Sequence, residues 1–539
     1  MNADNNIPKI LGAYYTDSQI ADFLVWWAVR SPSDRILDPS FGGGVFLRSA
    51  CKQLASSQVL GVEIDPEVHA RISEKLCDEF GTKPKNLRLG SFFDVGPGTL
   101  APVDAIVGNP PFIRFHRFSG DVRRRALACA LEQGVRLSEL ASSWAAFLVH
   151  SVSFLRPSGR IAMVVPAEFA HAAYAGAVLR HLLGSFQSVT ILTFRKRLFA
   201  DLNEDTMLLL ADGRGLGQGE LLWRDLAHAG ELSNLQMSPV LLPGTTRLDC
   251  EHKLVEQFVP QKARDLYRRL KESAETVELG DAADVGIGYV TGANDFFHVS
   301  LEMASEWRIP HDFLRPAVRR GRALAGLRFT RGDWDRAATT GDAGYLLSIA
   351  SAENLPDGVR RYIEAGEAQG VPKGYKCRNR FPWFRVPHVH HPDAFLTYMS
   401  GFTPRLVAND ANAVAPNTLH VVRLRAGAEL GVEALSALWQ TSLTRLSAEI
   451  EGHPLGGGML KLEPTEAERV VIANRRMKNT EAVGLVRELD RMIRAGKEED
   501  AQNLVDQRVL REGLGLSASD CATLQLSTET LRNRRTLRT

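Results

Sequence analysis

The stretch RILDPSFGGGVFLRSACKQL (residues 35–54) places a glycine-rich loop between an apolar segment and a helical one. Residues 35–40 predict a short strand that runs into the loop, and residues 45–54 have the apolar spacing of a helix. A second strand over residues 59–65 and a helix over residues 66–80 follow directly. Strands that alternate with helices predict a mostly parallel sheet with helices on both of its faces.

This alternation extends to about residue 212 and is lost beyond about residue 240. Further strands are expected over residues 87–93, 103–109, 160–166, 188–194 and 206–212, with helices over residues 20–29 and 143–155. The later part of the chain is richer in short strands, Gly, Pro, Arg and aromatic residues, and its last 65 or so residues look helical. We therefore expect an α/β domain over residues 1–240, a mixed α+β domain over residues 241–472 and a helical segment over residues 473–539.

The composition is typical of a soluble globular protein, with 44% apolar and 24% charged residues in a chain of 539. No apolar run approaches the ~20 residues of a membrane helix, and the N-terminus shows no signal-peptide pattern. Six scattered cysteines without a CxxC pair argue against disulfides and zinc, so we expect a cytoplasmic protein without a bound metal. Because the net charge is only +2, any nucleic-acid surface has to come from local basic clusters.

The glycine loop forms a first candidate site. Gly42, Gly43 and Gly44 let the backbone approach a ligand closely, and Asp38 ends the preceding strand, where its carboxylate could accept from a positively charged ligand. Glu63 ends the next strand, about 20 residues beyond the glycines, where an acidic residue is placed to bond ribose hydroxyls. The alternative is a tight strand-to-helix turn with a capping Asp38.

The segment GNPPF (residues 108–112) forms a second candidate site at the tip of the fourth strand. A planar exocyclic amine is a poor nucleophile, because its lone pair is delocalised into the ring. Two acceptors, the Asn109 side-chain oxygen and the Pro110 carbonyl, would pull the nitrogen toward a pyramidal geometry. Pro110 and Pro111 restrict the backbone, and Phe112 offers a face for stacking. The alternative is a rigid turn with a core Phe.

These two sites resemble those of the adenine-specific DNA methyltransferases of restriction–modification systems. In the subgroup often called gamma, the cofactor segment precedes the glycine loop and the recognition domain comes last. The same order holds here, through the motifs GAYYTDSQIADFL (12–24), DPSFGGGVF (38–46), GVEIDP (61–66), GSFFD (90–94) and GNPPF (108–112). More loosely, residues 285–297 and 449–464 are similar to the two ends of the family's target-recognition region.

The resemblance implies a Rossmann-like methyltransferase domain that uses S-adenosylmethionine, followed by a DNA-recognition domain. It implies that Thr16 meets the methionine carboxylate, Glu63 the ribose, and Ile64 and Phe92 the two faces of the cofactor's adenine. The implied cofactor-binding residues are Tyr15, Thr16, Asp38, Pro39, Gly42, Gly44, Glu63, Ile64, Ser91, Phe92 and Asn109. The implied catalytic residues are Asn109, Pro110, Pro111 and Phe112, with Phe199 as a second aromatic residue that closes on a flipped base.

Two positions depart from the pattern of this family. Asp17 stands where the family often has Pro, and Ser91 stands where it often has an Asp that bonds the cofactor's N6 amine. A serine can accept one hydrogen bond but without charge, so we expect cofactor binding to be modestly weaker than with Asp.

Basic residues concentrate in the second half of the chain. Residues 315–390 hold fourteen Lys and Arg against seven Asp and Glu, and KGYKCRNRFPWFR (373–385) interleaves five cations with four aromatics. This combination suits phosphate contact together with base stacking. The residues expected to contact DNA are Lys373, Lys376, Arg378, Arg380 and Arg385. The alternative is a solvated charged face with structural aromatics.

The expected function is methyl transfer to the N6 amino group of an adenine flipped out of double-stranded DNA, in a restriction–modification or phage-defence system. We expect a bacterial, nucleoid-associated monomer whose cognate endonuclease, if one exists, is a separate chain. Two alternatives stay open: an RNA or protein-glutamine N-methyltransferase with an NPPF active site, and a non-catalytic DNA-binding subunit.

Overall fold

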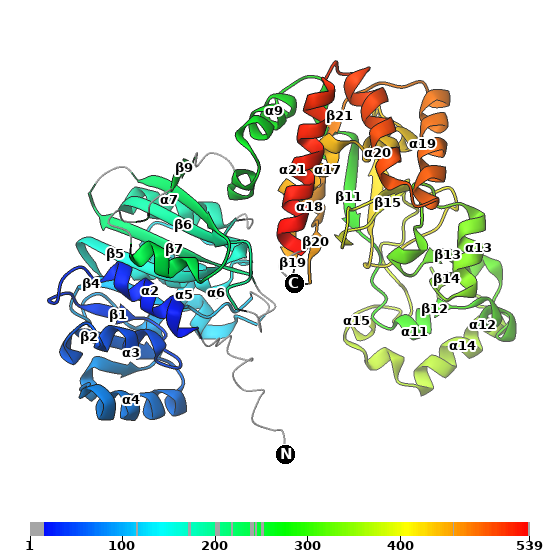
Figure 1. The fold of residues 1–539 in the computed structure, drawn as a ribbon. Helices are drawn as coiled ribbons and strands as arrows, with labels where there is room; N and C mark the ends of the chain where they lie inside the picture. Colours follow the sequence, from blue (N-terminus) through cyan, green and yellow to red (C-terminus); the bar gives the residue numbers. More distant parts are fainter. Residues whose placement is uncertain are drawn as a thin grey trace. The chain divides into compact units, whose positions relative to one another are not determined.

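The computed structural model of the chain describes residues 16–114, 117–170, 174–199, 205–216, 219–237, 242, 245–248, 253–455 and 457–536. The chain divides into two compact units, the first extending to Gln257 and the second running from Phe258 to Thr536 (Figure 1). The division falls later than the expected boundary at residue 240.

The first unit is built on one nine-stranded sheet with the order β3-β2-β1-β4-β5-β7-β6-β8-β9. Its strands are β1 (Ile36–Asp38), β2 (Val59–Glu63), β3 (Leu87–Leu89), β4 (Val103–Gly108), β5 (Leu155–Pro166), β6 (Phe186–Phe194), β7 (Thr206–Arg214), β8 (Glu220–Leu226) and β9 (Thr246–Leu248). Strands β1 to β5 pair in parallel, β7 is antiparallel to both β5 and β6, β8 is parallel to β6, and β9 is antiparallel to β8. The predicted mostly parallel α/β sheet is confirmed.

Helices pack against this sheet in two groups. The helices are α2 (Ser18–Ala28), α3 (Val45–Cys51), α4 (Pro66–Phe80), α5 (Gly120–Glu132), α6 (Ser143–Val152), α7 (Ala175–Ser185) and α8 (Glu231–Gln236). Helix α2 packs on α3 and α8, whereas α5, α6 and α7 pack in succession on one another. Strands β2 and β4 are almost wholly buried, which explains why they appear in the sequence as continuous apolar runs rather than as alternating ones.

Local sequence explains where α4 begins and ends. The side chain of Asp65 accepts the N–H groups of Glu67 and Val68 at 2.9 and 3.1 Å, and Pro66 occupies the first helical position. Gly81 ends the helix with φ of +67°, in the left-handed region that glycine adopts readily.

The second unit combines small antiparallel sheets with helices, as expected for a mixed α+β domain. Its sheets have the orders β10-β21, β11-β18-β15-β17, β12-β14-β13 and β16-β20-β19. The strands are β10 (Thr276–Glu278), β11 (Ala283–Ile287), β12 (His298–Val299), β13 (Leu314–Val318), β14 (Ala343–Leu347), β15 (Ala394–Leu396), β16 (Met399–Ser400), β17 (Leu406–Ala408), β18 (His420–Leu424), β19 (His453–Leu455), β20 (Met459–Lys461) and β21 (Val471–Ala473).

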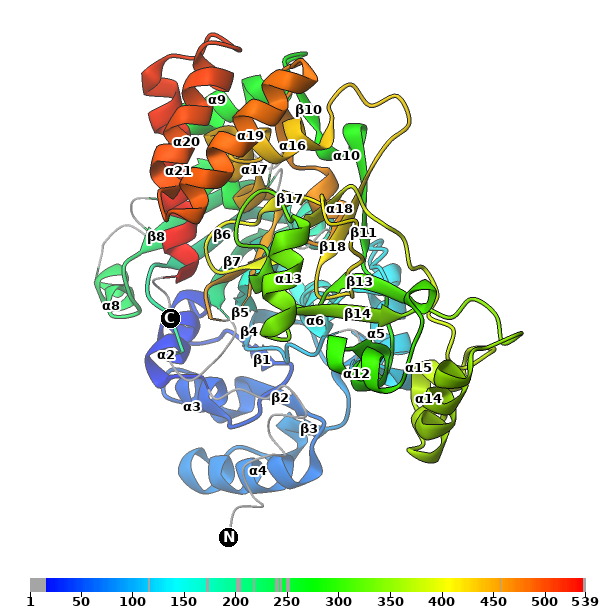
Figure 2. The same cartoon turned by 90° about the vertical axis from the view of Figure 1, so that its right-hand side faces the viewer.

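The helices of the second unit include the C-terminal ones. They are α9 (Gln261–Lys271), α10 (Leu279–Ala282), α11 (Asn294–Phe297), α12 (Leu301–Glu306), α13 (Arg331–Thr339), α14 (Asp357–Ala368), α15 (Tyr375–Arg378), α16 (Val432–Leu438), α17 (Ser442–Glu451), α18 (Pro464–Glu468), α19 (Asn479–Arg494), α20 (Glu498–Val505) and α21 (Ala518–Thr536). Helices α19, α20 and α21 lie side by side (Figures 1 and 2), and α21 packs on α17 and α9. The expected helical segment from residue 473 is therefore part of this unit.

A buried ion pair joins α21 to α17. Arg535 donates to both oxygens of Glu449, with Nε–Oε2 at 3.0 Å and Nη2–Oε1 at 2.8 Å, and both side chains are almost fully buried. Arg535 also donates to the carbonyls of Gly401, Phe402 and Gly458, so each nitrogen of the guanidinium has an acceptor. No helix in the described part of the chain is long and apolar enough to cross a membrane.

Candidate active site

Two central residues of the predicted cofactor and catalytic sites, Asp38 and Asn109, lie at the carboxyl ends of β1 and β4, which are neighbours in the sheet. Asp38 ends β1, and Asn109 follows Gly108, the last residue of β4. The parallel register, with Ile36 beside Ala105, sets these two strand ends next to each other. The strand order reverses here, because β2 and β3 extend the sheet on one side of β1, and β4 and β5 on the other. In open α/β sheets ligands bind at such a reversal.

The carboxyl group of Asp38 is buried and only partly hydrogen-bonded. Its Oδ1 accepts the backbone N–H of Ser40 at 3.1 Å, whereas Oδ2 has no donor among the described residues. Burial raises the pKa of Asp38 to about 8, with a smaller upward contribution from Glu63 and an opposing one from the Ser40 N–H. A Cβ on Gly108 would lie 3.0 Å from Oδ1, so this glycine leaves the room that the carboxyl group occupies. The unpartnered oxygen is suited to accept from a charged amine of a ligand.

The carboxylate of Glu63 ties the glycine loop to the end of β2. Its Oε2 accepts the N–H of Gly42, and its Oε1 accepts the N–H groups of Ile64 and Asp65, each at 2.9 Å. Gly42 has φ of +46°, a conformation that favours glycine. Oε2 keeps a lone pair for a ligand hydroxyl, and the neighbouring Ile64 side chain is 50% exposed. The end of β2 therefore offers a hydrogen-bond acceptor, Glu63 Oε2, next to the apolar side chain of Ile64.

Gly44 and Pro39 shape the loop through packing. Gly44 has φ of +73°, and a Cβ there would lie 2.6 Å from Cγ2 of Ile72 on α4. Pro39 is buried, and a Cβ on Gly108 would lie 3.4 Å from its Cδ. The approach of α4 thus requires a glycine at position 44 independently of any ligand.

The amide of Asn109 is oriented by Thr16, which lies 93 residues earlier in the chain. Asn109 Nδ2 donates to Thr16 Oγ1 at 3.2 Å, and Thr16 is buried. Asn109 Oδ1 is itself buried and has no donor among the described residues. Asp17, at the position where a proline was expected from the resemblance, accepts the N–H of Gln19 at 2.7 Å and caps α2. Tyr15 lies outside the described residues.

The structure adds Ser143, which the sequence analysis missed. The Ser143 hydroxyl donates to the carbonyl of Pro111 and accepts the N–H of Ile113 at 2.9 Å, while the Ser143 N–H donates to the Ile113 carbonyl at 3.0 Å. The first turn of α6 therefore clamps the segment that follows Asn109. The only signal in the sequence is a serine pair before an apolar helix, a pattern that is typical of helix starts in general.

The aromatic residues of the predicted site are mostly buried. Phe92 is 2% exposed and stacks on Phe147 with 5.6 Å between ring centroids, and Ser91 caps the short turn that carries it. Phe112 is 6% exposed, and Phe199 is half-buried against the same core. The site thus brings together Thr16, Asp38, Glu63 and Asn109, whereas Phe92 belongs to an aromatic cluster of the core.

Most of the cations predicted to contact DNA lie on the surface of the second unit. The exposed ones are Lys373, Lys376, Arg378 and Arg385. Arg380 is different, because its guanidinium is half-buried and donates to the carbonyls of Thr291, at 2.7 Å, and Val290. Arg380 therefore anchors the segment 373–385 to the rest of the unit.

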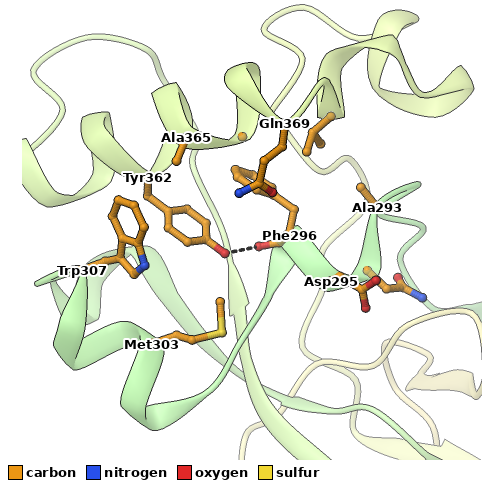
Figure 3. A pocket seen from close by; sticks show the side chains of 11 residues that line it. Ala293, Asp295, Phe296, Met303, Trp307, Tyr362, Ala365 and Gln369 are labelled. Carbon is orange, nitrogen blue, oxygen red and sulfur yellow. Dashed lines mark hydrogen bonds between the residues drawn. The ribbon is translucent and has the colours of Figure 1, made fainter.

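The second unit also contains a pocket of about 350 Å³ between α11, α12 and α14 (Figure 3). Phe296, Trp307 and Tyr362 form aromatic parts of its wall, and the Tyr362 hydroxyl donates to the Phe296 carbonyl at 2.8 Å. None of the five predicted DNA-contacting residues lines it.

Comparisons with known proteins agree with this fold. Residues 2–225 match the family described as N-6 DNA Methylase, and residues 251–510 match the Type II methyltransferase M.Eco57I, C-terminal domain. Type II methyltransferase M.AccI of Acinetobacter calcoaceticus is 21% identical over 469 residues, covering 86% of this chain and 85% of the relative. Type II methyltransferase M.XamI of Xanthomonas campestris pv. amaranthicola is 24% identical over 471 residues, with the same coverage of 86% and 85%.

Among solved structures, DrdV in a DrdV–DNA complex matches 91% of this chain and 58% of its own length, with a TM-score of 0.54 and 12% identity, a likeness of fold. The mostly parallel sheet with its packed helices is the α/β fold of the methyltransferase class. The two family matches and the Type II methyltransferase relatives together identify an adenine-specific DNA methyltransferase of restriction–modification type. The predicted resemblance to restriction–modification adenine methylases and the predicted enzyme class are confirmed, whereas the gamma-like motif order stays a prediction.

Proposed function

We propose that this enzyme transfers a methyl group from S-adenosylmethionine to the N6 amino group of an adenine flipped out of double-stranded DNA. The observation that carries the proposal is Asn109 Oδ1, a buried acceptor without a donor among the described residues, at the tip of β4. Thr16 holds Nδ2, so the oxygen is the amide atom left for a substrate N–H. A buried acceptor without a partner is destabilising, and a substrate amine would relieve this.

The chemistry follows from two acceptors held in fixed directions. Asn109 Oδ1 and the Pro110 carbonyl accept the two N–H groups of the adenine amine, which draws the nitrogen out of conjugation with the ring. The lone pair could then attack the methyl group as the carbon–sulfur bond of the donor breaks, which would leave a neutral thioether, and the extra proton would pass to solvent once the nitrogen is quaternary. No general base is required in the attack, and the protein contributes positioning and preorganised dipoles. The Ser143 clamp on Pro111 and Ile113 holds the acceptors in place.

The residues at the ends of β1 and β2 fit the cofactor. Asp38 Oδ2 is a buried oxygen without a described donor and suits the ammonium of the methionine part. Glu63 Oε2 keeps an acceptor site for a ribose hydroxyl, and Ile64 offers an exposed apolar side chain for an adenine face. When bound, S-adenosylmethionine supplies an electrophilic methyl group on a sulfonium.

The substrate must come to the site as a single base. An adenine within a duplex is inaccessible to a buried strand tip, so it has to leave the stack, at a cost of a few kcal/mol. The exposed cations of segment 373–385 would supply phosphate contacts. We place the enzyme at the bacterial nucleoid, as a monomer that modifies host DNA in a restriction–modification or phage-defence system beside a separate endonuclease.

The test is methyl transfer by Asn109→Ala, with Asn234→Ala as a control because Asn234 is exposed on α8. Loss of one preorganised polar group lowers the rate about 10²–10³-fold. We expect at least this loss for Asn109→Ala with folding and DNA affinity nearly intact, and full activity for Asn234→Ala. Labelled methyl donor with duplex DNA, RNA and protein, followed by nucleoside analysis, identifies the product. Full methylation by Asn109→Ala, or a label on RNA, protein or a ring atom, would overturn the proposal.

A further inference from the structure

Phe381 is the most exposed of the large apolar side chains in the described part of the chain. The residue is 97% exposed and lies within the basic segment 373–385. A ring left in water forgoes the stabilisation that burial gives an aromatic side chain. Such a position therefore calls for an explanation in terms of a partner.

The loop that carries Phe381 is anchored on both sides of it. On one side, Arg380 donates to the carbonyls of Val290 and Thr291. On the other side, Trp383 Nε1 donates to Glu367 Oε1 at 3.0 Å, and Phe384 is buried. Phe381 therefore projects from a supported backbone rather than from a loose loop.

Trp383, on the C-terminal side of Phe381, packs against aromatic residues of the core of the second unit. The Trp383 ring lies 5.2 Å from the Phe296 ring, which stacks on Tyr362 at 4.8 Å. Tyr362 belongs to α14 and donates to the Phe296 carbonyl, as Figure 3 shows. The backbone that carries Phe381 is therefore held by packed helices. A side chain that is inserted into another molecule needs such a rigid support.

The surroundings of Phe381 are positively charged. Segment 373–385 contains no acidic residue. Four of its cations are exposed, and among the described residues none of these four has a carboxylate partner: Lys373, Lys376, Arg378 and Arg385. Arg378 lies over the ring of Tyr375, which is 66% exposed, with 5.3 Å to its centroid. An exposed apolar ring in a segment of exposed cations fits stacked bases between two phosphate backbones better than it fits an apolar protein surface.

We propose that Phe381 inserts between adjacent base pairs of bound duplex DNA, while Lys376, Arg378 and Arg385 contact the flanking phosphates. Apolar side chains used in this way partly unstack a base step, and the duplex bends and unwinds there. The inference rests on duplex DNA being the substrate, but it does not depend on the chemistry at Asn109.

The test uses the full chain and a closed circular plasmid relaxed by a topoisomerase in the presence of the protein. Insertion unwinds DNA, so the wild-type protein should shift the topoisomer distribution, and Phe381→Ala should not. Phe402→Ala is the matched control, because Phe402 is an aromatic residue of the same unit, 47% exposed, whose face is covered by Arg532 at 4.1 Å. It should behave as the wild type.

Affinity for the same linearised plasmid gives a second measurement. Base–aromatic stacking predicts that Phe381→Ala weakens binding about 5- to 150-fold, with an unchanged dependence on salt because no charge is lost. Lys376→Ala should instead reduce the slope of log K against log salt by about one. A topoisomer shift by Phe381→Ala equal to that of the wild type, or no shift by the wild type, would overturn the proposal.

The two proposals fail in different ways. Asn109→Ala should still shift the topoisomers, because it leaves the second unit unchanged. If Phe381→Ala removed the topoisomer shift while Asn109→Ala methylated DNA fully, the insertion of Phe381 would be supported and the proposed catalytic role of Asn109 would be refuted.

Discussion

Replacement of Ser143 by alanine tests whether the clamp on the NPPF segment matters for catalysis. The substitution removes one donor to the Pro111 carbonyl and one acceptor of the Ile113 N–H, and it leaves the Ser143 backbone bond to Ile113 intact. Both backbone groups are half-buried, so water restores only part of what is lost.

The expected loss of stability is about 1 kcal/mol per hydrogen bond, or about 2 kcal/mol in all. In a unit of this size, that corresponds to a fall of about 4–8 °C in its melting temperature. The expected loss of activity is larger. A displacement of reacting groups by about 1 Å lowers a rate about 10²-fold, so kcat should fall about 10- to 100-fold while the cofactor dissociation constant stays nearly unchanged.

Ser151→Ala is the matched control, because Ser151 is a buried serine on the same helix. Its hydroxyl donates only to the Phe147 carbonyl at 2.7 Å, within α6, so its removal leaves the helical bonds in place. Single-turnover methylation and thermal denaturation of both variants check the prediction. If Ser143→Ala kept the wild-type kcat, or if Ser151→Ala lost as much activity, the clamp would have no positioning role.

Two further predictions concern buried carboxyl groups. The pKa of Asp38 is raised to about 8 in the folded protein. The cofactor-free protein therefore loses folding stability as pH rises from about 4 toward 8, because only the unfolded chain ionises readily in this range. A cationic cofactor should bind the ionised form of Asp38. Affinity should therefore rise with pH up to about 8, with proton release in calorimetry, and Asp38→Asn should abolish both effects. Arg535→Ala leaves Glu449 buried and unpaired, and should destabilise the second unit by about 3–5 kcal/mol in urea denaturation. Arg425→Ala, which breaks an exposed pair, should cost less than about 1 kcal/mol.

Some features of the recognition unit depend on tertiary contacts that no local pattern reveals. Residues 432–450 have the apolar spacing of one helix, but the structure has α16 and α17 with a break over residues 439–441, where the Thr441 hydroxyl caps α17. Arg380 was grouped with the cations that contact DNA, yet it donates to the carbonyls of Val290 and Thr291. An arginine in a basic segment looks the same in sequence whether it faces solvent or a carbonyl.

The sequence by itself determined the α/β sheet and the residues at its switch point. Asp38, Glu63 and Asn109 follow apolar runs directly, and the carboxyl ends of parallel strands share one edge, so local spacing was enough to bring them together. Only the tertiary structure decided how these groups are held. The bond from Asn109 to Thr16 spans 93 residues, and Ser143 reaches Pro111 across 32. Such contacts depend on how the helices pack on the sheet. They produce no repeating pattern in the sequence, so the sequence alone does not reveal them.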